Sequence, residues 1–317
     1  MSLAIVFPGQ GSQSVGMLAA LAEAQPIVQQ TFAEASEVLG YDLWDLCQRG
    51  PDSDLGATER TQPAMLAAGV ATWRAWRSRS GPMPVAMAGH SLGEYTALVC
   101  ANALDFRAAV DLVRFRGRVM QAAVPRDQGA MAAILGFDDA QIAAACLDAA
   151  QGEVVEAVNF NAPGQVVIAG HAPAVQRAIE TAKARGAKRA VLLPVSVPSH
   201  SSLMRGAAEE LGARLAETQF RMPDVGAVYT VDIKVHESVD GIRRALKEQL
   251  FRPVRWADTV RAMLASGVTT LIECGPGKVL TSLNRRIERR SDLAMLALDD
   301  PATLDAALTA CREKGHA

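Results

Sequence analysis

One serine lies in a setting that is typical of a nucleophile. Ser91 is the centre of a Gly-x-Ser-x-Gly pattern at residues 89–93, between the apolar run Pro84–Ala88 and the helical pattern of Leu92–Ala101. In such a strand–turn–helix the glycines allow a sharp turn that exposes the hydroxyl, and the helix start offers N–H groups to an oxyanion. We therefore predict a serine that attacks a carbonyl carbon. Glu94, in the first helical turn, is interpreted as a charge favoured by the helix dipole and not as a catalytic acid.

A serine hydroxyl needs a base, usually a histidine, to take its proton. Of the five histidines, His90 lies inside the turn, and we expect its ring to point away from Ser91 and to pack there. Three others lie in the middle of the chain, in a polar loop and in the C-terminal tail: His171, His236 and His316. His200 follows an apolar stretch and begins a helix. It is the favoured base, although spacing alone leaves the choice open.

The segments around Ser91 and His200 alternate short apolar runs with helical patterns, which is typical of an α/β protein. Strands are expected at Leu3–Phe7, Pro84–Ala88, Gly226–Val231, Thr269–Cys274 and Leu293–Leu298. Helices are expected at Ala64–Ser78, Leu92–Ala101, from the cap Asp105 to Met120, Ser201–Thr218, Val239–Phe251, from the Gly275-Pro276-Gly277 turn to near Arg290, and Pro301–Lys314. We predict a hydrolase-like main domain with a parallel sheet and a nucleophile elbow, formed by residues 1–125 and 198–317.

The middle of the chain has a different order of elements. The pattern there predicts strand, helix, strand, strand, helix and strand at Ala130–Leu135, Asp138–Ala150, Val154–Asn159, Gln165–Ala169, Pro173–Arg185 and Lys188–Pro194. This β-α-β-β-α-β order is that of a ferredoxin-like unit. We therefore predict a small ferredoxin-like domain at residues 126–197, inserted into the main domain.

The composition excludes several classes of function. With 32 Lys and Arg against 34 Asp and Glu, the net charge is −2, which argues against a nucleic-acid partner. No apolar run approaches the ~18 residues of a membrane span, and the apolar N-terminus lacks the basic flank of a signal peptide, so we expect a cytoplasmic protein. The five cysteines are scattered and predict reduced, buried thiols. We expect no metal and no cofactor, and nothing in the sequence requires an oligomer.

Several motifs, in order, resemble those of malonyl-CoA:acyl carrier protein transacylases of type II fatty acid synthesis. They are Phe7–Gln13, Thr61–Ala64, Gly89–Glu94, Asn159–Asn161, Pro163–Gln165, Val197–His200, Gln249–Val254 and Gly275–Lys278. The resemblance runs from Leu3 to the end of the chain and includes the inserted segment. One departure is Thr230, where close relatives often carry Asn.

The resemblance implies a role for each catalytic residue. Ser91 would be the nucleophile and His200 the base. Gln249, a neutral amide, would orient His200 by accepting a hydrogen bond from its ring N–H. The main-chain N–H groups of Gln10 and Leu92 would form the oxyanion hole.

The resemblance also implies a pocket for the acyl group. Arg116 would bind the free carboxylate of a malonyl group, because a guanidinium can grip a carboxylate with two hydrogen bonds. Gln62 and Met120 would line the same pocket. From the sequence alone, Arg116 looks like a solvated helix arginine, since three more arginines are close in sequence: Arg107, Arg114 and Arg118.

These expectations describe a ping-pong enzyme with two substrates, malonyl-CoA and acyl carrier protein. The carrier protein is acidic, so its dock should be basic. Two groups of cations could supply it: Arg285, Arg286, Arg289 and Arg290 near a helix end, and Lys183, Arg185, Lys188 and Arg189 in the insert. The alternatives are a serine thioesterase, an acyltransferase of polyketide synthesis or malonate decarboxylation, and a non-catalytic module that binds the carrier protein.

Overall fold

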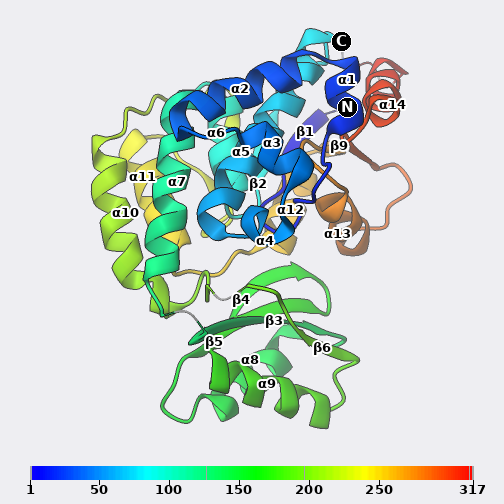
Figure 1. Cartoon of the computed structure of the whole chain (residues 1–317). Coiled ribbons are helices and arrows are strands. Elements are labelled where there is room, and N and C mark those ends of the chain that lie inside the picture. Colours follow the sequence, from blue (N-terminus) through cyan, green and yellow to red (C-terminus); the bar gives the residue numbers. More distant parts are fainter. Residues whose placement is uncertain (1, 126, 196, 314, 316–317) are drawn as a thin grey trace.

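The chain forms two bodies, each built on its own β-sheet. The computed structural model describes residues 2–125, 127–195, 197–313 and 315. The larger body has a six-stranded sheet and the smaller body a four-stranded sheet, which lies beneath the larger body in Figure 1. The α/β fold with an inserted antiparallel sheet is therefore confirmed, while the exact bounds of the insert, 126–197, stay a prediction.

The sheet of the larger body is parallel except at one edge. Its strand order is β10 (Ala294–Ala297), β9 (Val268–Glu273), β1 (Ser2–Phe7), β2 (Ala86–Gly89), β7 (Gly226–Tyr229) and β8 (Lys234–Val235), and only β8 runs antiparallel to its neighbour. Strand β1 lies between β9 and β2, and every residue from Leu3 to Phe7 is buried, so both of its faces are covered. This explains its unbroken apolar sequence, because a strand buried on both sides has no face for polar residues.

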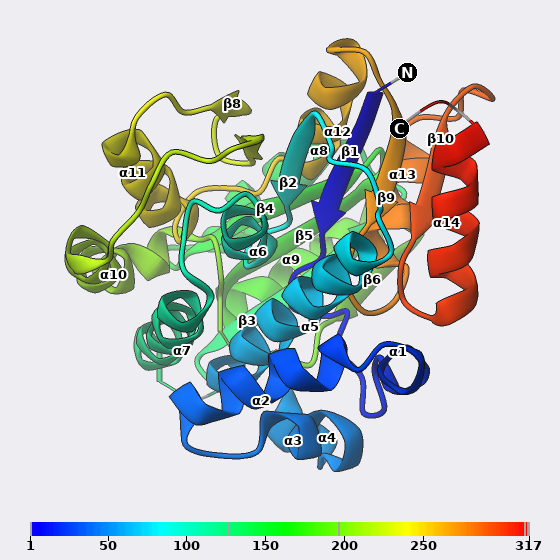
Figure 2. The ribbon, with the colours of Figure 1, turned by 90° about the horizontal axis from the view of Figure 1, so that it is seen from above.

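Helices cover both sides of this sheet (Figure 2). On one face of β1, Leu3, Ile5 and Phe7 pack with the buried helix α5 (Thr58–Ser78) and with α6 (Gly93–Cys100). On the other face, Ala4 and Val6 pack with α12 (Trp256–Ala265) and α13 (Val279–Ile287). The remaining helices are α1 (Ala19–Ala24), α2 (Ile27–Leu39), α3 (Leu43–Arg49), α4 (Asp52–Leu55), α7 (Phe106–Ala122), η1 (Ser202–Met204), α10 (Arg205–Glu217), α11 (Val239–Gln249) and α14 (Pro301–Glu313).

Two parts of this body differ from the sequence interpretation. No element was assigned to the segments that form α1 to α4 and α12. Helix α5 begins at Thr58, six residues before the predicted start, and continues through Pro63. Other signals were accurate: Asp105 caps α7 by accepting a hydrogen bond from the main-chain N–H of Ala108 at 3.0 Å, as the sequence predicted.

The smaller body has the strand order of a ferredoxin-like unit. Its elements are β3 (Gly129–Leu135), α8 (Asp139–Ala150), β4 (Val155–Ala162), β5 (Gln165–His171), α9 (Ala172–Ala184) and β6 (Arg189–Leu192). All neighbouring strands are antiparallel, in the order β4-β5-β3-β6. One face of the sheet packs on α8 and α9. Met131, Val158 and Val167 lie together on the other face, which is turned toward the larger body in Figure 1.

The two bodies are joined by main-chain hydrogen bonds as well as side chains. The N–H of Phe160 in β4 donates to the carbonyl of Val254 at 2.9 Å, and the N–H of Val254 donates to the carbonyl of Val158 at 2.8 Å. The carboxylate of Glu156 accepts from the main-chain N–H and the hydroxyl of Ser202 at 2.8 and 2.7 Å. Strand β4 is therefore fixed against the larger body beside the helix that follows His200.

Two general predictions can be compared with the described residues. All five cysteines are buried, as expected. Within the described ranges, no helix is long and apolar enough to cross a membrane.

Candidate active site

The turn at Ser91 is the predicted nucleophile elbow. Ser91 has φ 52°, in the left-handed region, between the end of β2 and the start of α6. A Cβ on Gly89 would lie 1.8 Å from the carbonyl carbon of Gly93, and a Cβ on Gly93 would lie 2.1 Å from the carbonyl oxygen of Phe7. Both positions therefore require glycine, which is why this spacing recurs wherever a chain turns so sharply.

His200 is the histidine that meets the Ser91 hydroxyl. Its Nε2 lies 2.8 Å from Ser91 Oγ, and its Nδ1 lies 2.6 Å from the main-chain carbonyl oxygen of Gln249. Because a carbonyl oxygen can only accept, Nδ1 carries the proton and Nε2 is free to accept one from Ser91. The acceptor is thus the main chain of Gln249; the side-chain amide on which the sequence interpretation relied has other partners.

The surroundings of His200 keep the ring neutral. The side chain is 3% exposed. Burial, reinforced by the charge of Arg116, lowers the pKa of His200 to about 3. The residue has φ 66°, and its N–H donates to the carbonyl of Leu250 at 2.9 Å, which helps to hold this left-handed conformation. His200 is therefore available as a base at any pH near neutrality.

Arg116 is buried beside the nucleophile, not solvated. It is 1% exposed, and its Nη1 donates to Oε1 of Gln62 at 2.9 Å. Its Nη2 donates to Oε1 of Gln249 at 2.9 Å and to Ser91 Oγ at 3.2 Å. No described residue accepts a hydrogen bond from its Nε. The nearby Arg107 and Arg114 form surface ion pairs instead. A buried cation with a spare donor, next to a nucleophilic oxygen, is suited to a substrate that carries an anion.

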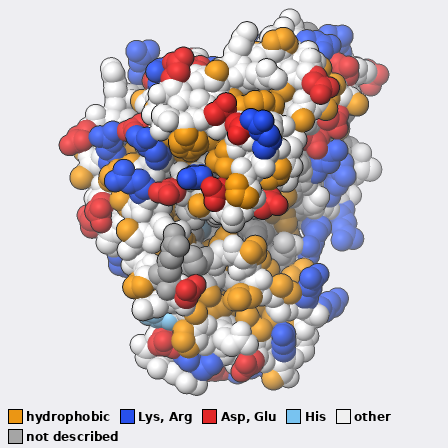
Figure 3. Space-filling model, viewed as in Figure 1, with side chains coloured by type: hydrophobic (Ala, Val, Ile, Leu, Met, Phe, Trp, Pro, Cys, Tyr) orange, Lys and Arg blue, Asp and Glu red, His pale blue; other side chains and the backbone are white. Residues whose placement is uncertain are grey.

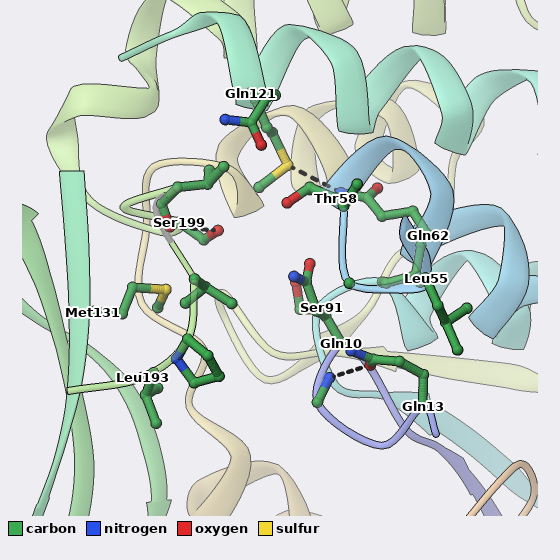
Figure 4. Close-up of a pocket in the computed structure, with 18 of the residues that line it drawn as sticks. Gln10, Gln13, Leu55, Thr58, Gln62, Ser91, Gln121, Met131, Leu193 and Ser199 are labelled. Atoms are coloured by element: carbon green, nitrogen blue, oxygen red, sulfur yellow. Dashed lines mark hydrogen bonds between the residues drawn. The ribbon is translucent and has the colours of Figure 1, made fainter. Parts of the chain in front are cut away.

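A cavity of about 860 Å³ opens over these residues, between the two bodies. Ser91, Gln10 and Gln62 lie on one side of it, opposite Met131 and Leu193 of the smaller body (Figure 4). Leu92, Arg116, Met120 and His200 also line the cavity. Gln62 Nε2 donates to the sulfur of Met120 at 3.5 Å. All the candidate catalytic and pocket residues except Gln249 therefore line one cavity. Gln249 does not line it but forms hydrogen bonds with Ser91, Arg116 and His200.

Glu94 has a larger part in this site than the sequence suggested. It lies in the first turn of α6, as expected, but it is only 2% exposed. Its Oε1 accepts from the N–H and the hydroxyl of Thr230 at 2.8 and 2.7 Å, and its Oε2 accepts from Nε2 of Gln249. Burial raises the pKa of Glu94 to about 7, against the lowering effect of these donors and of Arg116. The missed signal was a lone carboxylate in a helix with no other charged residue.

The other described histidines form no hydrogen bond with the Ser91 hydroxyl, although His90, its neighbour in the sequence, also lines the cavity. His90 Nε2 lies 2.9 Å from Oδ1 of Asn161 in β4, and its ring lies against Trp256 with centroids 5.7 Å apart, so its predicted packing role is confirmed. His171 accepts from the main-chain N–H of Val154, and His236 lies beside Asp232. His316 lies outside the described residues. No group of three or more potential metal ligands occurs in the part of the chain that the structure describes.

Comparison with known proteins assigns the chain to a family. Residues 4–298 match the acyl transferase domain family. The chain is 57% identical to the malonyl CoA-acyl carrier protein transacylase of Salmonella typhimurium, over 96% of this chain and 98% of that protein. The identity to the Bacillus subtilis protein of the same name is 43%, over 98% of both chains. The chain belongs to the family of malonyl CoA-acyl carrier protein transacylases. The resemblance inferred from the motifs is thereby confirmed.

Solved structures of the family have the same fold. An acyl carrier protein S-malonyltransferase from Vibrio cholerae superimposes with a TM-score of 0.93 and 57% identity, covering 96% of this chain and 99% of that one. A malonyl-transacylase solved in complex with a type II PKS acyl-carrier protein, PlMCAT:AntF, gives a TM-score of 0.96 and 54% identity, over 98% of this chain and 100% of that one.

Proposed function

We propose that this enzyme transfers the malonyl group of malonyl-CoA to the phosphopantetheine thiol of acyl carrier protein, through an ester on Ser91, for fatty acid synthesis. The observation that carries the proposal is the position of Arg116. Its guanidinium is buried, its Nη2 lies 3.2 Å from Ser91 Oγ, and its two Nη atoms donate three of the four hydrogen bonds that they can make. The free carboxylate of a malonyl ester on Ser91 would lie within reach of that cation.

In the first half-reaction Ser91 is acylated. His200 Nε2 takes the hydroxyl proton while Ser91 Oγ attacks the thioester carbonyl, and the N–H groups of Gln10 and Leu92 stabilise the oxyanion. When the C–S bond breaks, the proton on His200 passes to the sulfur of CoA. CoA leaves, and malonyl remains as an ester on Ser91.

The second half-reaction reverses these steps with a new thiol. The phosphopantetheine thiol gives its proton to His200 and attacks the ester carbonyl; the C–O bond breaks and Ser91 regains a proton. A neutral carbonyl opposite His200 Nδ1 stabilises an imidazolium less than a carboxylate would. In the first half-reaction this suffices, because the CoA thiolate is a far better leaving group than an amine or an alkoxide. In the second, the Ser91 oxygen leaves as it takes back the proton held by His200. The steps need no metal, nucleotide or flavin.

Arg116 is proposed to select malonyl over acetyl groups. A charge-assisted hydrogen bond contributes about 1.5–3 kcal/mol, and a buried charge without its partner costs more. A malonyl ester would give the guanidinium a counter-charge, while an acetyl ester would leave it without one. Gln62 and Met120 would limit the space around the acyl group.

The carrier protein is proposed to dock beside the cavity on exposed basic residues of both bodies. Arg286 of α13 donates to Gln165 of β5, and Gln165 and Arg189 both pair with Leu135 of β3, so the two basic regions are close together. In the view of Figure 3, Lys and Arg side chains gather along the right-hand side of the molecule, over the region of α13 and the smaller body. We place the enzyme in the cytoplasm, where its substrates would occur.

One alternative keeps the chemistry and changes the pathway. The chain is 42% identical to part of the polyketide biosynthesis protein ThaF of Burkholderia thailandensis, over 90% of this chain and 24% of that protein. Supply of malonyl groups to a polyketide carrier protein is therefore a second candidate. Acylation of Ser91 is common to both pathways, and comparing carrier proteins as acceptors would separate them.

The test is to weigh the intact protein after incubation with malonyl-CoA or acetyl-CoA, beside Ser91→Ala and Arg116→Ala. We expect a malonyl adduct that disappears in Ser91→Ala, falls about 100-fold in rate in Arg116→Ala, and moves to added carrier protein. Release of free malonate without an adduct would support a thioesterase instead.

A further inference from the structure

Glu94 is a buried carboxylate that the proposed mechanism does not use. It does not line the cavity, and its three hydrogen-bond donors belong to Thr230 and Gln249. A buried carboxylate is costly unless every lone pair has a donor. Its place in the fold, three residues after the nucleophile, therefore calls for a reason beyond the favourable start of α6.

The amide of Gln249 connects Glu94 to Arg116. Its Nε2 donates to Glu94 and, at 2.9 Å, to the main-chain carbonyl of Ser91, while its Oε1 accepts from Arg116 Nη2. The guanidinium can only donate, and an ionised carboxylate or a carbonyl can only accept. All three neighbours thus require the same orientation of the amide. Arg116, Gln249 and Glu94 form one directed chain of hydrogen bonds.

These hydrogen bonds determine how the guanidinium of Arg116 is oriented toward the cavity. Its Nη2 is held by Gln249 and its Nη1 by Gln62, so the guanidinium plane is fixed beside Ser91. Two parallel hydrogen bonds to a carboxylate depend on that plane. We propose that Glu94 is a positioning residue which, through the amide of Gln249, holds Arg116 in the orientation that selects malonyl. This inference rests on the proposed function.

Replacing Glu94 by Gln would interrupt this series of hydrogen bonds, although the two side chains have the same shape. With Oε1 of the new Gln side chain on the main-chain N–H of Thr230, its NH₂ would face the NH₂ of Gln249. Turning Gln249 around would place its NH₂ against Arg116 and leave the Ser91 carbonyl without its donor. Every arrangement therefore contains one donor facing another donor, which buried groups do not tolerate.

Positioning and simple charge compensation predict opposite results. If Glu94 only balanced the charge of Arg116, its removal would strengthen malonyl binding, because two anions would no longer repel each other. Glu94→Asp, which keeps the charge, would then behave like the natural enzyme. If Glu94 positions Arg116, both variants weaken malonyl transfer, since Asp is one methylene too short to reach Gln249.

The experiment compares two acyl donors at pH 8. Acylation of Ser91 by malonyl-CoA depends on Arg116, whereas p-nitrophenyl acetate, a small neutral ester, needs only Ser91 and His200. For Glu94→Gln and Glu94→Asp we expect kcat/KM for malonyl-CoA to fall about 10- to 100-fold, with the ester rate within about threefold of the natural enzyme. In an Arg116→Ala background the same changes should add little to the malonyl loss.

Glu273→Gln is the matched control. Glu273 is also a buried carboxylate, 1% exposed, but it accepts from the N–H groups of Leu280 and Thr281 at the start of α13, away from the cavity. Glu273→Gln should leave the ratio of the rate with malonyl-CoA to the rate with p-nitrophenyl acetate unaltered. If a Glu94 variant does not fold, Thr230→Val replaces it: loss of one hydroxyl donor to Glu94 should lower that ratio about threefold.

Three results would overturn the inference: equal loss with both donors, stronger malonyl transfer in Glu94→Gln, or an unchanged ratio in Thr230→Val. Failure of the proposed function is a separate result. In that case the natural enzyme itself would form no malonyl ester with malonyl-CoA, whatever the residue at position 94.

Discussion

The ionisable side chains around Ser91 in the larger body and those of the proposed dock in the smaller body differ in how exposed they are. In the larger body Arg116, Glu94 and His200 are only 1%, 2% and 3% exposed, and each bonds to specific neighbours. In the smaller body Lys188 and Arg189 are exposed at the start of the edge strand β6. A buried ionisable group acts at short range and depends on one geometry, whereas an exposed cation acts over about a Debye length and is screened by salt. The larger body thus supplies the proposed chemistry, and the smaller one is proposed to help recognise the partner.

Among these side chains, we expect the largest loss of activity when His200 is removed. In His200→Ala no base lies beside Ser91 Oγ, so we expect the rate of acylation by malonyl-CoA to fall about 10³-fold, measured by rapid quench and intact mass. His171→Ala, which changes a histidine of the smaller body 3.0 Å from the N–H of Val154, is the matched control and should keep the natural rate. A small effect of His200→Ala would place the base elsewhere.

A smaller and salt-dependent effect is expected at the surface. Reversing charge with Lys188→Glu and Arg189→Glu should raise KM for acyl carrier protein about three- to tenfold and leave acylation by malonyl-CoA unchanged. The increase should shrink at high salt. The control is Lys234→Glu with Arg244→Glu, two exposed cations that do not line the cavity. If KM for the carrier protein is the same in both double variants, the smaller body has no part in the dock.

The smallest effect concerns pH. The pKa of His200 is lowered to about 3, so the ring stays neutral in the folded protein while an ordinary histidine would take up a proton below about pH 6.5. We expect the rate of Ser91 acylation by p-nitrophenyl acetate to change less than about twofold between pH 8 and pH 5. A loss of half the rate near pH 6.5 would show a normally titrating base.

The same pKa determines the sign of a stability effect. Between about pH 6.5 and pH 3 the unfolded chain binds a proton at His200 that the folded chain cannot, so the free energy of unfolding falls as the pH decreases. Above pH 6.5 neither state is protonated there and this contribution vanishes. Denaturant unfolding of the natural protein and of His200→Ala at pH 8 and pH 5 would isolate it. The titrations of His90, whose pKa burial lowers, and of Glu94 and Glu273, whose pKa values burial raises to about 7, are present in both proteins and cancel.

Local sequence patterns were sufficient to predict the elbow and the order of helices and strands in the smaller body. A sharp turn needs glycine at fixed positions, and strands and helices each have a characteristic spacing of apolar residues, so both can be recognised in a short stretch of sequence. Helices α1, α3 and α4 were missed because they have only 6, 7 and 4 residues, whereas α2, with 13 residues, was long enough to have been found. His200 was already the favoured base from its position, but only the resemblance decided that choice, because nothing in the chemistry of one segment relates it to another 109 residues away.

The sequence by itself was therefore enough to predict the fold class, the candidate nucleophile Ser91 and, through its motifs, the family. Only the tertiary structure decided the environment of each charge: that Arg116 is buried, that His200 bonds to the main chain of Gln249, and that Glu94 bonds to Thr230 and Gln249. The physical reason is that backbone turns and amphipathic periods are local properties, whereas burial and hydrogen-bond partners arise where distant segments meet.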